Sequence, residues 1–194
     1  MIAKTKITGI ILAGGKSSRM GTDKGLLFFN EKMFIQHIID SITPLVSEIL
    51  IVSENTEYDQ LGYKRVEDSI KNSGPIGGIH AGLSSSEREY NLILSCDVPL
   101  ITSKLLKRLL TKENSVFDIV QFEANGNTIP LIALFKRQCL KKCQELLDQG
   151  EKRLRKLVLE LRTKTISLPK EEHILVSNIN TMKDLNEIKN GVNY

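Results

Sequence analysis

The sequence predicts an α/β fold in which a mostly parallel β-sheet is covered by helices and carries an antiparallel insertion. Three apolar runs have the length and the β-branched content of strands buried on both faces, namely 7–12, 49–52 and 90–95. Helical segments alternate with these runs along the first part of the chain, which is typical of a parallel sheet. Asn125-Gly126 then separates two further apolar runs, and this dipeptide predicts a hairpin that adds antiparallel strands.

The elements follow in order along the chain. Apolar residues recur at helical spacing from Phe34 to Ile42, and Pro44 marks the end of that helix. Thr102 is the expected N-cap of a helix over 104–111. We expect further helices at 58–61, from 74 onward, and at 138–148, 153–160 and 181–189. The remaining strands are expected at 64–66, 117–123, 131–135, 165–168 and 174–176.

Length and composition favour one domain over residues 1–194, because this length suffices for one substantial core and no linker or repeat interrupts it. No apolar run approaches the ~20 residues that span a bilayer. The amino end lacks the apolar core of a signal peptide, so we expect a cytoplasmic protein without a membrane partner. Cys139 and Cys143 lie one helical turn apart, where core packing is a better explanation than zinc binding.

Positive charge is concentrated in one part of the chain. The net charge is +4, but residues 104–164 hold 14 Lys and Arg against 7 Asp and Glu. This excess fits nucleic-acid binding, a solvated helical face or an anionic small-molecule acceptor. No aromatic residues are interleaved with the charges and no nucleic-acid motif is present, so we expect no nucleic-acid partner.

A glycine-rich loop follows the first apolar run. It begins Ala13-Gly14-Gly15 and carries Arg19 and Lys24. Glycines after a buried strand let backbone N–H groups approach an anion, and the two cations add full charge, so the loop predicts a polyphosphate site. It matches neither the P-loop nor the dinucleotide fingerprint. The alternative is a glycine-rich turn whose cations are merely solvated.

Other polar residues stand where predicted strands end. In open α/β sheets, ligands bind beyond the carboxyl ends of the strands, and Ser53 and Asp97 occupy two such positions. Asp97 is the best candidate ligand for Mg²⁺, which needs only one or two carboxylates beside the phosphate oxygens of a nucleotide. The alternative role of Asp97 is that of a turn-forming residue ahead of Pro99.

The segment Leu12-Ala13-Gly14-Gly15-x-Ser17-x-Arg19-Met20-Gly21-x-Asp23-Lys24 resembles the signature of the MobA-type molybdenum cofactor guanylyltransferases, a family of nucleotidyltransferases. The resemblance implies a three-layer, Rossmann-like nucleotide-diphospho-sugar transferase fold. It also implies transfer of GMP from GTP to the phosphate of molybdopterin, with pyrophosphate as the second product. In this family the loop wraps the triphosphate.

The resemblance also implies roles for individual residues. Arg19, Lys24 and Asp97 would be catalytic, with Mg²⁺ held by Asp97. Asp68 lies in an E-D segment that contacts GTP in the family, and Gly74-Pro75-x-x-Gly78 matches a G-P-x-x-G near the base. The expected GTP-binding residues are therefore Leu12, Ala13, Gly14, Gly15, Lys24, Ser53, Asp68, Gly74, Pro75, Gly78 and Asp97. Without the resemblance, the sequence predicts only a surface charge at Asp68 and a tight turn into a helix at 74–78.

Two groups of residues are candidates for the acceptor site. Asn178 and Asn180 belong to a segment that resembles the family's N-x-N-T-P-x-D-L, in which Met182 replaces the proline. Read alone, this segment is a cap for the final helix. Arg153 and Arg155 lie on a basic helix that would receive the acceptor's phosphate, and a solvated face explains them equally well.

Two rival functions remain to be distinguished. A sibling nucleotidyltransferase using CTP or a sugar-1-phosphate acceptor typically reads L-A-A-G at 12–15 and lacks the G-P-x-x-G, so the sequence favours GTP. Ser53 departs from the Asn of guanylyltransferases, which leaves the ribose or base contact there open. The other rival is a non-catalytic adaptor that binds nucleotide and hands cofactor to other proteins. Molybdoenzymes or cofactor-handling proteins are the further partners that the resemblance suggests.

Overall fold

The computed structural model describes residues 1–14, 23–68, 70, 73–181 and 184. Within this part of the chain a seven-stranded sheet runs in the order β5-β4-β1-β6-β8-β7-β9. Strands β5, β4, β1 and β6 are parallel, whereas β8 is antiparallel to both β6 and β7, and β9 is parallel to β7. The bounds are β1 (Ile7–Leu12), β4 (Glu48–Val52), β5 (Lys64–Val66), β6 (Tyr90–Ser95), β7 (Ile119–Ala124), β8 (Asn127–Lys136) and β9 (Thr163–Ser167).

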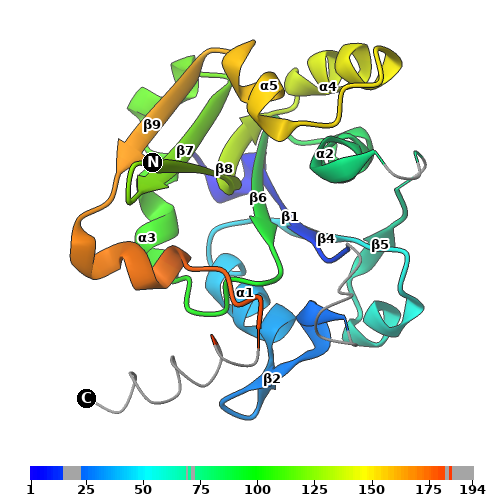
Figure 1. Ribbon diagram of the computed structural model, residues 1–194, viewed down its shortest axis with the longest axis vertical. Coiled ribbons are helices and arrows are strands. Elements are labelled where there is room, and N and C mark those ends of the chain that lie inside the picture. Colours follow the sequence, from blue (N-terminus) through cyan, green and yellow to red (C-terminus); the bar gives the residue numbers. More distant parts are fainter. Residues whose placement is uncertain (15–22, 69, 71–72, 182–183, 185–194) are drawn as a thin grey trace.

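Helices cover both faces of the sheet (Figure 1). Helices α1 (Phe34–Ile42) and α3 (Ser103–Leu106) pack in one apolar cluster, and α2 (Gly74–Ser85), α4 (Cys139–Asp148) and α5 (Leu154–Leu159) pack in another. Strand β1 supplies both clusters, since Ile7 and Ile11 face one side and Ile10 the other, as the two-residue period of a strand requires. This arrangement confirms the three-layer α/β fold with an antiparallel insertion.

Cys139 and Cys143 belong to the second cluster, where both thiols are buried. Burial raises the pKa of each thiol to about 12. The prediction that these cysteines pack in the core is therefore confirmed.

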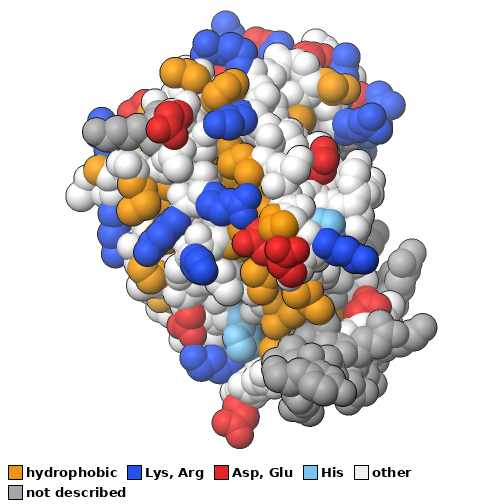
Figure 2. Space-filling model, turned by 90° about the vertical axis from the view of Figure 1, so that its left-hand side faces the viewer, with side chains coloured by type: hydrophobic (Ala, Val, Ile, Leu, Met, Phe, Trp, Pro, Cys, Tyr) orange, Lys and Arg blue, Asp and Glu red, His pale blue; other side chains and the backbone are white. Residues whose placement is uncertain are grey.

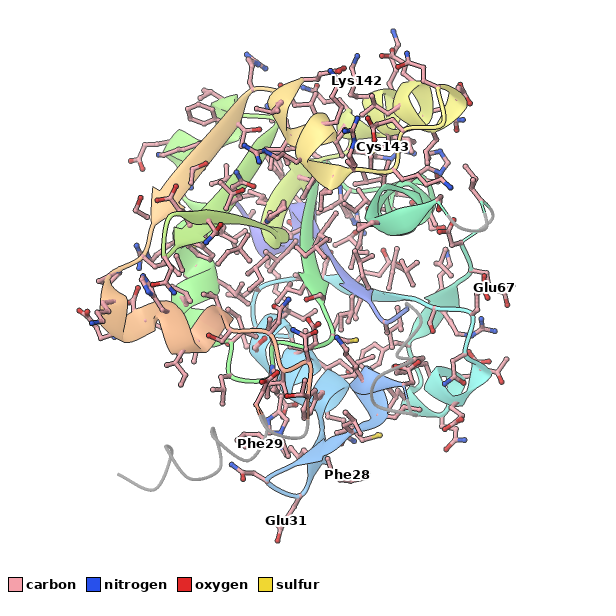
Figure 3. All side chains as sticks on the ribbon, in the orientation of Figure 1. Phe28, Phe29, Glu31, Glu67, Lys142 and Cys143 are labelled. Atoms are coloured by element: carbon pink, nitrogen blue, oxygen red, sulfur yellow. The ribbon has the colours of Figure 1, made fainter. Side chains whose placement is uncertain are left out.

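A small hairpin of β2 (Phe28–Phe29) and β3 (Lys32–Met33) was not predicted from the sequence. Its turn places Asn30 at φ 45° and Glu31 at φ 65°, a left-handed conformation without a glycine to indicate it. Figure 3 shows Glu31 at the tip of this hairpin, and Phe28, at the start of β2, is 61% exposed. Phe29 is buried instead, in a third apolar cluster that also contains Phe34 and Ile179.

Two sequence predictions are wrong in detail. The expected helix over 104–111 is the single turn α3 followed by a 3-10 segment, Lys107–Leu110. The Asn114 amide donates 3.0 Å hydrogen bonds to the carbonyls of Arg108 and Leu109, which a continuing α-helix would use for its own N–H groups.

The expected strand at 174–176 lies in a 3-10 segment, Lys170–Val176. His173 bonds back to the Leu168 carbonyl at 3.0 Å and closes the chain into a turn before it can extend. The other 3-10 segments are Lys4–Lys6, Lys24–Leu26, Thr56–Leu61 and Lys112–Val116. The helix expected at 181–189 lies outside the described residues except at its positions 181 and 184.

The surface carries charges of both signs. Figure 2 shows Asp and Glu side chains interspersed with Lys and Arg on one face. Arg108 pairs with Glu172 at 2.6 Å, so part of the positive excess of the second half of the chain is compensated locally. Among the helices described, none has both the length and the apolar character needed to cross a bilayer.

Candidate active site

Four neighbouring parallel strands end at one edge of the sheet, and a candidate residue follows each of them. Ala13 and Gly14 follow β1, Ser53 follows β4, Asp68 lies two residues past β5, and Asp97 lies two residues past β6. Because β5, β4, β1 and β6 are adjacent, the structure brings these segments to a common edge, as the sequence predicts.

The start of the glycine loop is held from both sides. The Ala13 N–H donates to the Val52 carbonyl at 2.9 Å, and the Leu12 carbonyl accepts from the Cys96 N–H at 3.1 Å. A Cβ on Gly14 would approach the Val52 carbonyl oxygen only to 4.0 Å, so there is space beside this residue. Gly15 and Arg19 lie outside the described residues, and their roles remain predictions.

Lys24 lies at the centre of the site. It belongs to the 3-10 turn Lys24–Leu26, and its ammonium donates to Asp97 Oδ2 at 3.3 Å and to Asn180 Oδ1. The Lys24 side chain is 23% exposed and the Asp97 side chain 13%, so water screens this ion pair less than it would screen a surface pair.

Asp97 is oriented by its other oxygen and by its backbone. The Ser95 hydroxyl donates to Asp97 Oδ1 at 2.6 Å, and the Asp97 carbonyl accepts from the Ile179 N–H at 2.8 Å. One carboxylate oxygen is thus fixed by Ser95 and the other faces a cation. Asp97 itself lies in the turn that follows β6, and its role as a ligand of Mg²⁺ remains a prediction.

The carboxyl-terminal segment reaches this edge through an apolar anchor. Ile179 is completely buried against Phe29 and Phe34, and the next residue, Asn180, meets Lys24. The Asp184 carboxylate accepts from the N–H groups of Asn180 and Thr181 at 2.9 and 3.0 Å, and Thr181 Oγ1 accepts from the Asp184 N–H. Asn180 is thus held by a local capping contact while its side chain meets Lys24, and Asn178 is exposed; the acceptor roles of both residues remain predictions.

The start of α2 packs against Asp68. The Asp68 carboxylate accepts from the Ile70 N–H at 3.0 Å and from the Ser73 hydroxyl at 2.8 Å. A Cβ at Gly77 would lie 1.6 Å from Ser73 Oγ, so only glycine fits there. The G-P-x-x-G motif of residues 74–78 does not specify a glycine at this position. A Cβ at Gly78 would lie 3.4 Å from Leu12 Cδ2, which places the first turn of α2 over the end of β1.

The basic helix begins beside α2. Gly74 has φ 65°, and a Cβ there would lie 3.1 Å from the Lys152 carbonyl oxygen; Pro75 follows in the first turn of α2. Arg153 is 79% exposed and bonds to Glu151, and this hydrogen bond lowers the pKa of Glu151 to about 2. Arg155 is exposed on α5. The acceptor roles of Arg153 and Arg155 remain predictions, and Arg153 already has a partner.

Ser53 is used within the protein itself. It is buried, its hydroxyl accepts from the Asn55 N–H at 3.1 Å, and its carbonyl accepts from Arg65 Nη1 at 3.0 Å. Arg65 also bonds to Glu67 at 2.9 Å. The Ser53 hydroxyl therefore organises the turn after β4, and a nucleotide contact by Ser53 remains a prediction.

A second set of contacts involves residues to which sequence reasoning assigned no role. Tyr58 donates from its hydroxyl to Asp23 Oδ1 at 2.5 Å, and Asn55 Nδ2 lies 3.5 Å from Asp23 Oδ2. Asp23 was visible only as a member of the signature. Tyr58 stands in a polar stretch with no periodic pattern, so no local signal indicates its burial.

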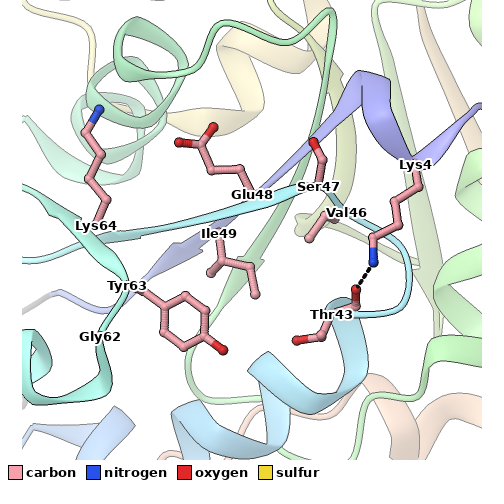
Figure 4. A pocket seen from close by; sticks show the side chains of 9 residues that line it. All are labelled: Lys4, Thr43, Val46, Ser47, Glu48, Ile49, Gly62, Tyr63 and Lys64. Carbon is pink, nitrogen blue, oxygen red and sulfur yellow. Dashed lines mark hydrogen bonds between the residues drawn. The ribbon is translucent and has the colours of Figure 1, made fainter.

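A hollow of about 400 Å³ lies at the opposite edge of the sheet, where β4 and β5 begin. Figure 4 shows Tyr63 and Lys64 lining it from one side and Lys4 from the other, with the Lys4 ammonium donating to the Thr43 carbonyl at 2.9 Å. It is separate from the strand ends described above. Among the described residues, no three His, Cys, Asp or Glu side chains gather as a metal cluster.

Comparison with known proteins finds relatives that match almost the whole chain. Residues 9–165 match the family described as the MobA-like NTP transferase domain. A protein of Flavobacterium johnsoniae named "Probable molybdenum cofactor guanylyltransferase" is 37% identical over 182 residues, covering 94% of this chain and 96% of the relative. A "Molybdenum cofactor guanylyltransferase" of Vibrio vulnificus is 33% identical over 190 residues, covering 96% and 97%.

A solved structure shares the fold. Molybdopterin-guanine dinucleotide biosynthesis protein A from Archaeoglobus fulgidus superposes with a TM-score of 0.80 at 20% identity, covering 95% of this chain and 98% of that one. The family match spans most of the chain, and it includes every one of the four strand ends that meet at the site. This chain belongs to the MobA-like NTP transferase family.

Proposed function

We propose that this protein transfers GMP from GTP to the phosphate of molybdopterin and releases pyrophosphate. The observation that carries the proposal is the position of the Lys24 ammonium, which bonds to Asp97 and Asn180 at the strand edge where the glycine loop begins. The names of the relatives support the choice of nucleotide and acceptor.

The oxygen atoms at this edge suit a divalent cation. The Asp97 carboxylate and the Asn180 amide oxygen together hold a positive charge in the form of the Lys24 ammonium, and both are oxygen ligands of the kind that Mg²⁺ prefers. Asp97 would hold the ion, with phosphate oxygens and water completing its coordination. When bound, Mg²⁺ would supply charge that neutralises the phosphate groups.

The residues of the chain then perform two tasks. The first is to place the acceptor phosphate in line with the α-phosphorus of GTP, because correct placement of two reactants removes much of the entropic barrier. An acceptor oxygen forms a bond to the α-phosphorus while the bond to the bridging oxygen breaks, and its electrons leave with pyrophosphate. A phosphate monoester has a second pKa of about 6, so the nucleophile is already ionised and needs no general base.

The second task is to stabilise the charge that develops on the leaving pyrophosphate. The turn that follows the glycine loop positions Lys24 at this edge, and with Asp97 holding the divalent cation its ammonium would stabilise the charge that develops on pyrophosphate. Arg19 of the same loop would share this role.

The test measures pyrophosphate release with each of the four nucleoside triphosphates in the presence of molybdopterin and Mg²⁺. GTP should be the preferred donor. A preference for CTP or UTP would assign the chain to a sibling nucleotidyltransferase, and binding of GTP without any release would favour the adaptor.

A variant of the cation site sharpens this test. Asp97→Asn keeps the size of the side chain but removes its charge, and turnover should fall by roughly 100-fold or more, as for other charge-stabilising groups. Asp40→Asn is the matched control, because Asp40 is an exposed carboxylate paired with Lys32 at 2.7 Å. Equal activity of the Asp97 and Asp40 variants would exclude a cation role for Asp97.

A further inference from the structure

Tyr58 is a buried residue with a polar contact to the glycine loop. Its side chain comes from the 3-10 segment Thr56–Leu61 after β4, it has no solvent exposure, and its hydroxyl bonds to Asp23 Oδ1 at 2.5 Å. Burial raises the pKa of the Tyr58 hydroxyl, and the nearby Cys96 and the bond to Asp23 act in the same direction. Tyr58 is therefore a permanent hydrogen-bond donor to this carboxylate.

Asp23 collects donors from three directions. Besides Tyr58, the Gly25 N–H donates to Oδ1 at 3.1 Å and the Asn55 amide lies 3.5 Å from Oδ2. Asp23 is the N-cap of the 3-10 turn Lys24–Leu26, so the orientation of its carboxylate determines how this turn begins. The next residue along the chain is Lys24, whose ammonium meets Asp97.

The packing around Tyr58 is close enough to transmit this constraint. A Cβ on Gly25 would lie 2.3 Å from the Tyr58 hydroxyl oxygen and 3.4 Å from Cys96 Cβ, so the turn, the phenol ring and the end of β6 are in direct contact. Gly25 is itself buried. Cys96 immediately precedes Asp97, and the same contact therefore relates the turn that carries Lys24 to the strand end that carries Asp97.

We propose that Tyr58 is a positioning residue that acts through Asp23 to hold Lys24 against Asp97. Two described residues flank the glycine loop: the Ala13 N–H bonds to the Val52 carbonyl at the end of β4, and Asp23 bonds to Tyr58 in the segment that follows β4. Tyr58 thus fixes the far end of the loop that the proposed function assigns to the triphosphate. The placement of Lys24 is independent of that function, which enters only in the kinetic test below.

The first test reads the position of Lys24 without any nucleotide. Acetic anhydride acylates lysines according to their accessibility and pairing, and peptide mass spectrometry reports each site. In Tyr58→Phe, which keeps the ring and removes only the hydroxyl, Lys24 should be acylated roughly 2- to 10-fold faster, the range expected from losing one hydrogen bond. Lys142 is the internal reference, because it is 30% exposed, bonds to Glu145 at 2.6 Å and lies at the far end of the molecule (Figure 3).

Two further variants keep this test decisive. Tyr63→Phe is the matched control, since Tyr63 lines the hollow at the opposite edge of the sheet, and its Lys24 rate should equal that of the wild type. Asp23→Ala removes the acceptor of the Tyr58–Asp23 hydrogen bond. It should show the same faster acylation of Lys24, and it replaces Tyr58→Phe in the test if Tyr58→Phe folds poorly. An unchanged Lys24 rate in a folded Tyr58→Phe or Asp23→Ala protein, or an equal rise at Lys142, would overturn the proposal.

The second test uses pyrophosphate release and separates positioning from general stability. Tyr58→Phe should lower kcat roughly 2- to 10-fold in the wild-type background and by less than about 2-fold in a Lys24→Ala background, because the two residues act as one unit. Equal losses in both backgrounds would contradict the proposal. If the wild type releases no pyrophosphate from GTP while the acylation result holds, the proposed function fails and the positioning role of Tyr58 stands.

Discussion

At the scale of single residues, the site depends on side chains that serve two partners at once. Asp97 accepts from Ser95 on one oxygen and from Lys24 on the other, and its backbone carbonyl binds the carboxyl-terminal segment through Ile179. Such shared contacts mean that replacing one side chain leaves several polar groups without a partner. Loss of a buried charge contact costs more free energy than the contact contributes when it is intact.

Lys24→Ala tests this scale directly. The variant removes a partly buried charge contact worth roughly 1.5–3 kcal/mol, so kcat/KM for GTP should fall by about 10- to 150-fold. Steady-state pyrophosphate release measures the effect. Lys32→Ala is the control, since Lys32 is 55% exposed and pairs with Asp40 on the surface. Unchanged kinetics in Lys24→Ala would refute the assignment of the glycine loop to the triphosphate.

At the scale of elements, α2 is placed by its glycines rather than by large side chains. A Cβ at Gly82 would lie 2.6 Å from Ile10 Cγ2 and 3.4 Å from Val52 Cγ2, so the helix lies almost directly on β1 and β4. This close approach carries the first turn of α2 over the ends of the same strands, where the nucleotide site is expected. Glycine lowers helix propensity, and the close packing offsets that cost.

Gly82→Ala should therefore destabilise the protein even though alanine is the better helix former. The added methyl group would force α2 away from Ile10, at a cost of about 1–3 kcal/mol for an overpacked core. Urea denaturation followed by circular dichroism measures the free energy of unfolding. Ser84→Ala, at an exposed position of the same helix, should leave that free energy nearly unchanged. A Gly82→Ala protein as stable as the wild type would show that α2 is not held against the sheet.

At the scale of the whole molecule, Asp118 joins the antiparallel half of the sheet to its helices. Its carboxylate accepts from the Arg162 N–H at 3.1 Å and from Gln138 Nε2 at 2.5 Å, and so it links the start of β7 to the segments before α4 and β9. Burial opposes ionisation of Asp118, but the hydrogen bonds from Arg162 and Gln138 outweigh it and lower its pKa.

This lowered pKa predicts a pH-dependent stability. The ionised form of Asp118 is favoured in the folded state, so its contribution is complete above the ordinary pKa of 3.8 and is lost as the pH falls through the lower folded value. The wild type should exceed Asp118→Asn in free energy of unfolding at pH 7 and at pH 5, and the difference should shrink below pH 3.8. Urea denaturation across this range measures it.

The control for this experiment is Asp148→Asn, since Asp148 bonds to Gln144 on the exposed side of α4. Its difference from the wild type at pH 7 should be small. If the difference in free energy of unfolding between the wild type and Asp118→Asn stays constant down to pH 2, protonation of Asp118 is not coupled to folding.

Much of the architecture was visible in the local pattern of the sequence. The strand runs at 7–12, 49–52 and 90–95 and the Asn125-Gly126 turn were found because each has a local period or a turn signal. The end of α3 at Leu106 was not found, because the segment that follows it is held by Asn114, whose amide bonds to the carbonyls of Arg108 and Leu109 from outside the helix. The β2–β3 hairpin was also not found, because its turn contains no glycine.

The sequence by itself determined the strand runs, the glycine loop and the residues at the strand ends, because these depend on neighbours along the chain. Only the tertiary structure decided that Lys24 meets Asp97, 73 positions away, and Asn180, 156 positions away. The bond from Tyr58 to Asp23 and the absence of space for a side chain at Gly77 and Gly82 were decided in the same way. Such contacts depend on how the helices pack on the sheet, and no local period records that packing.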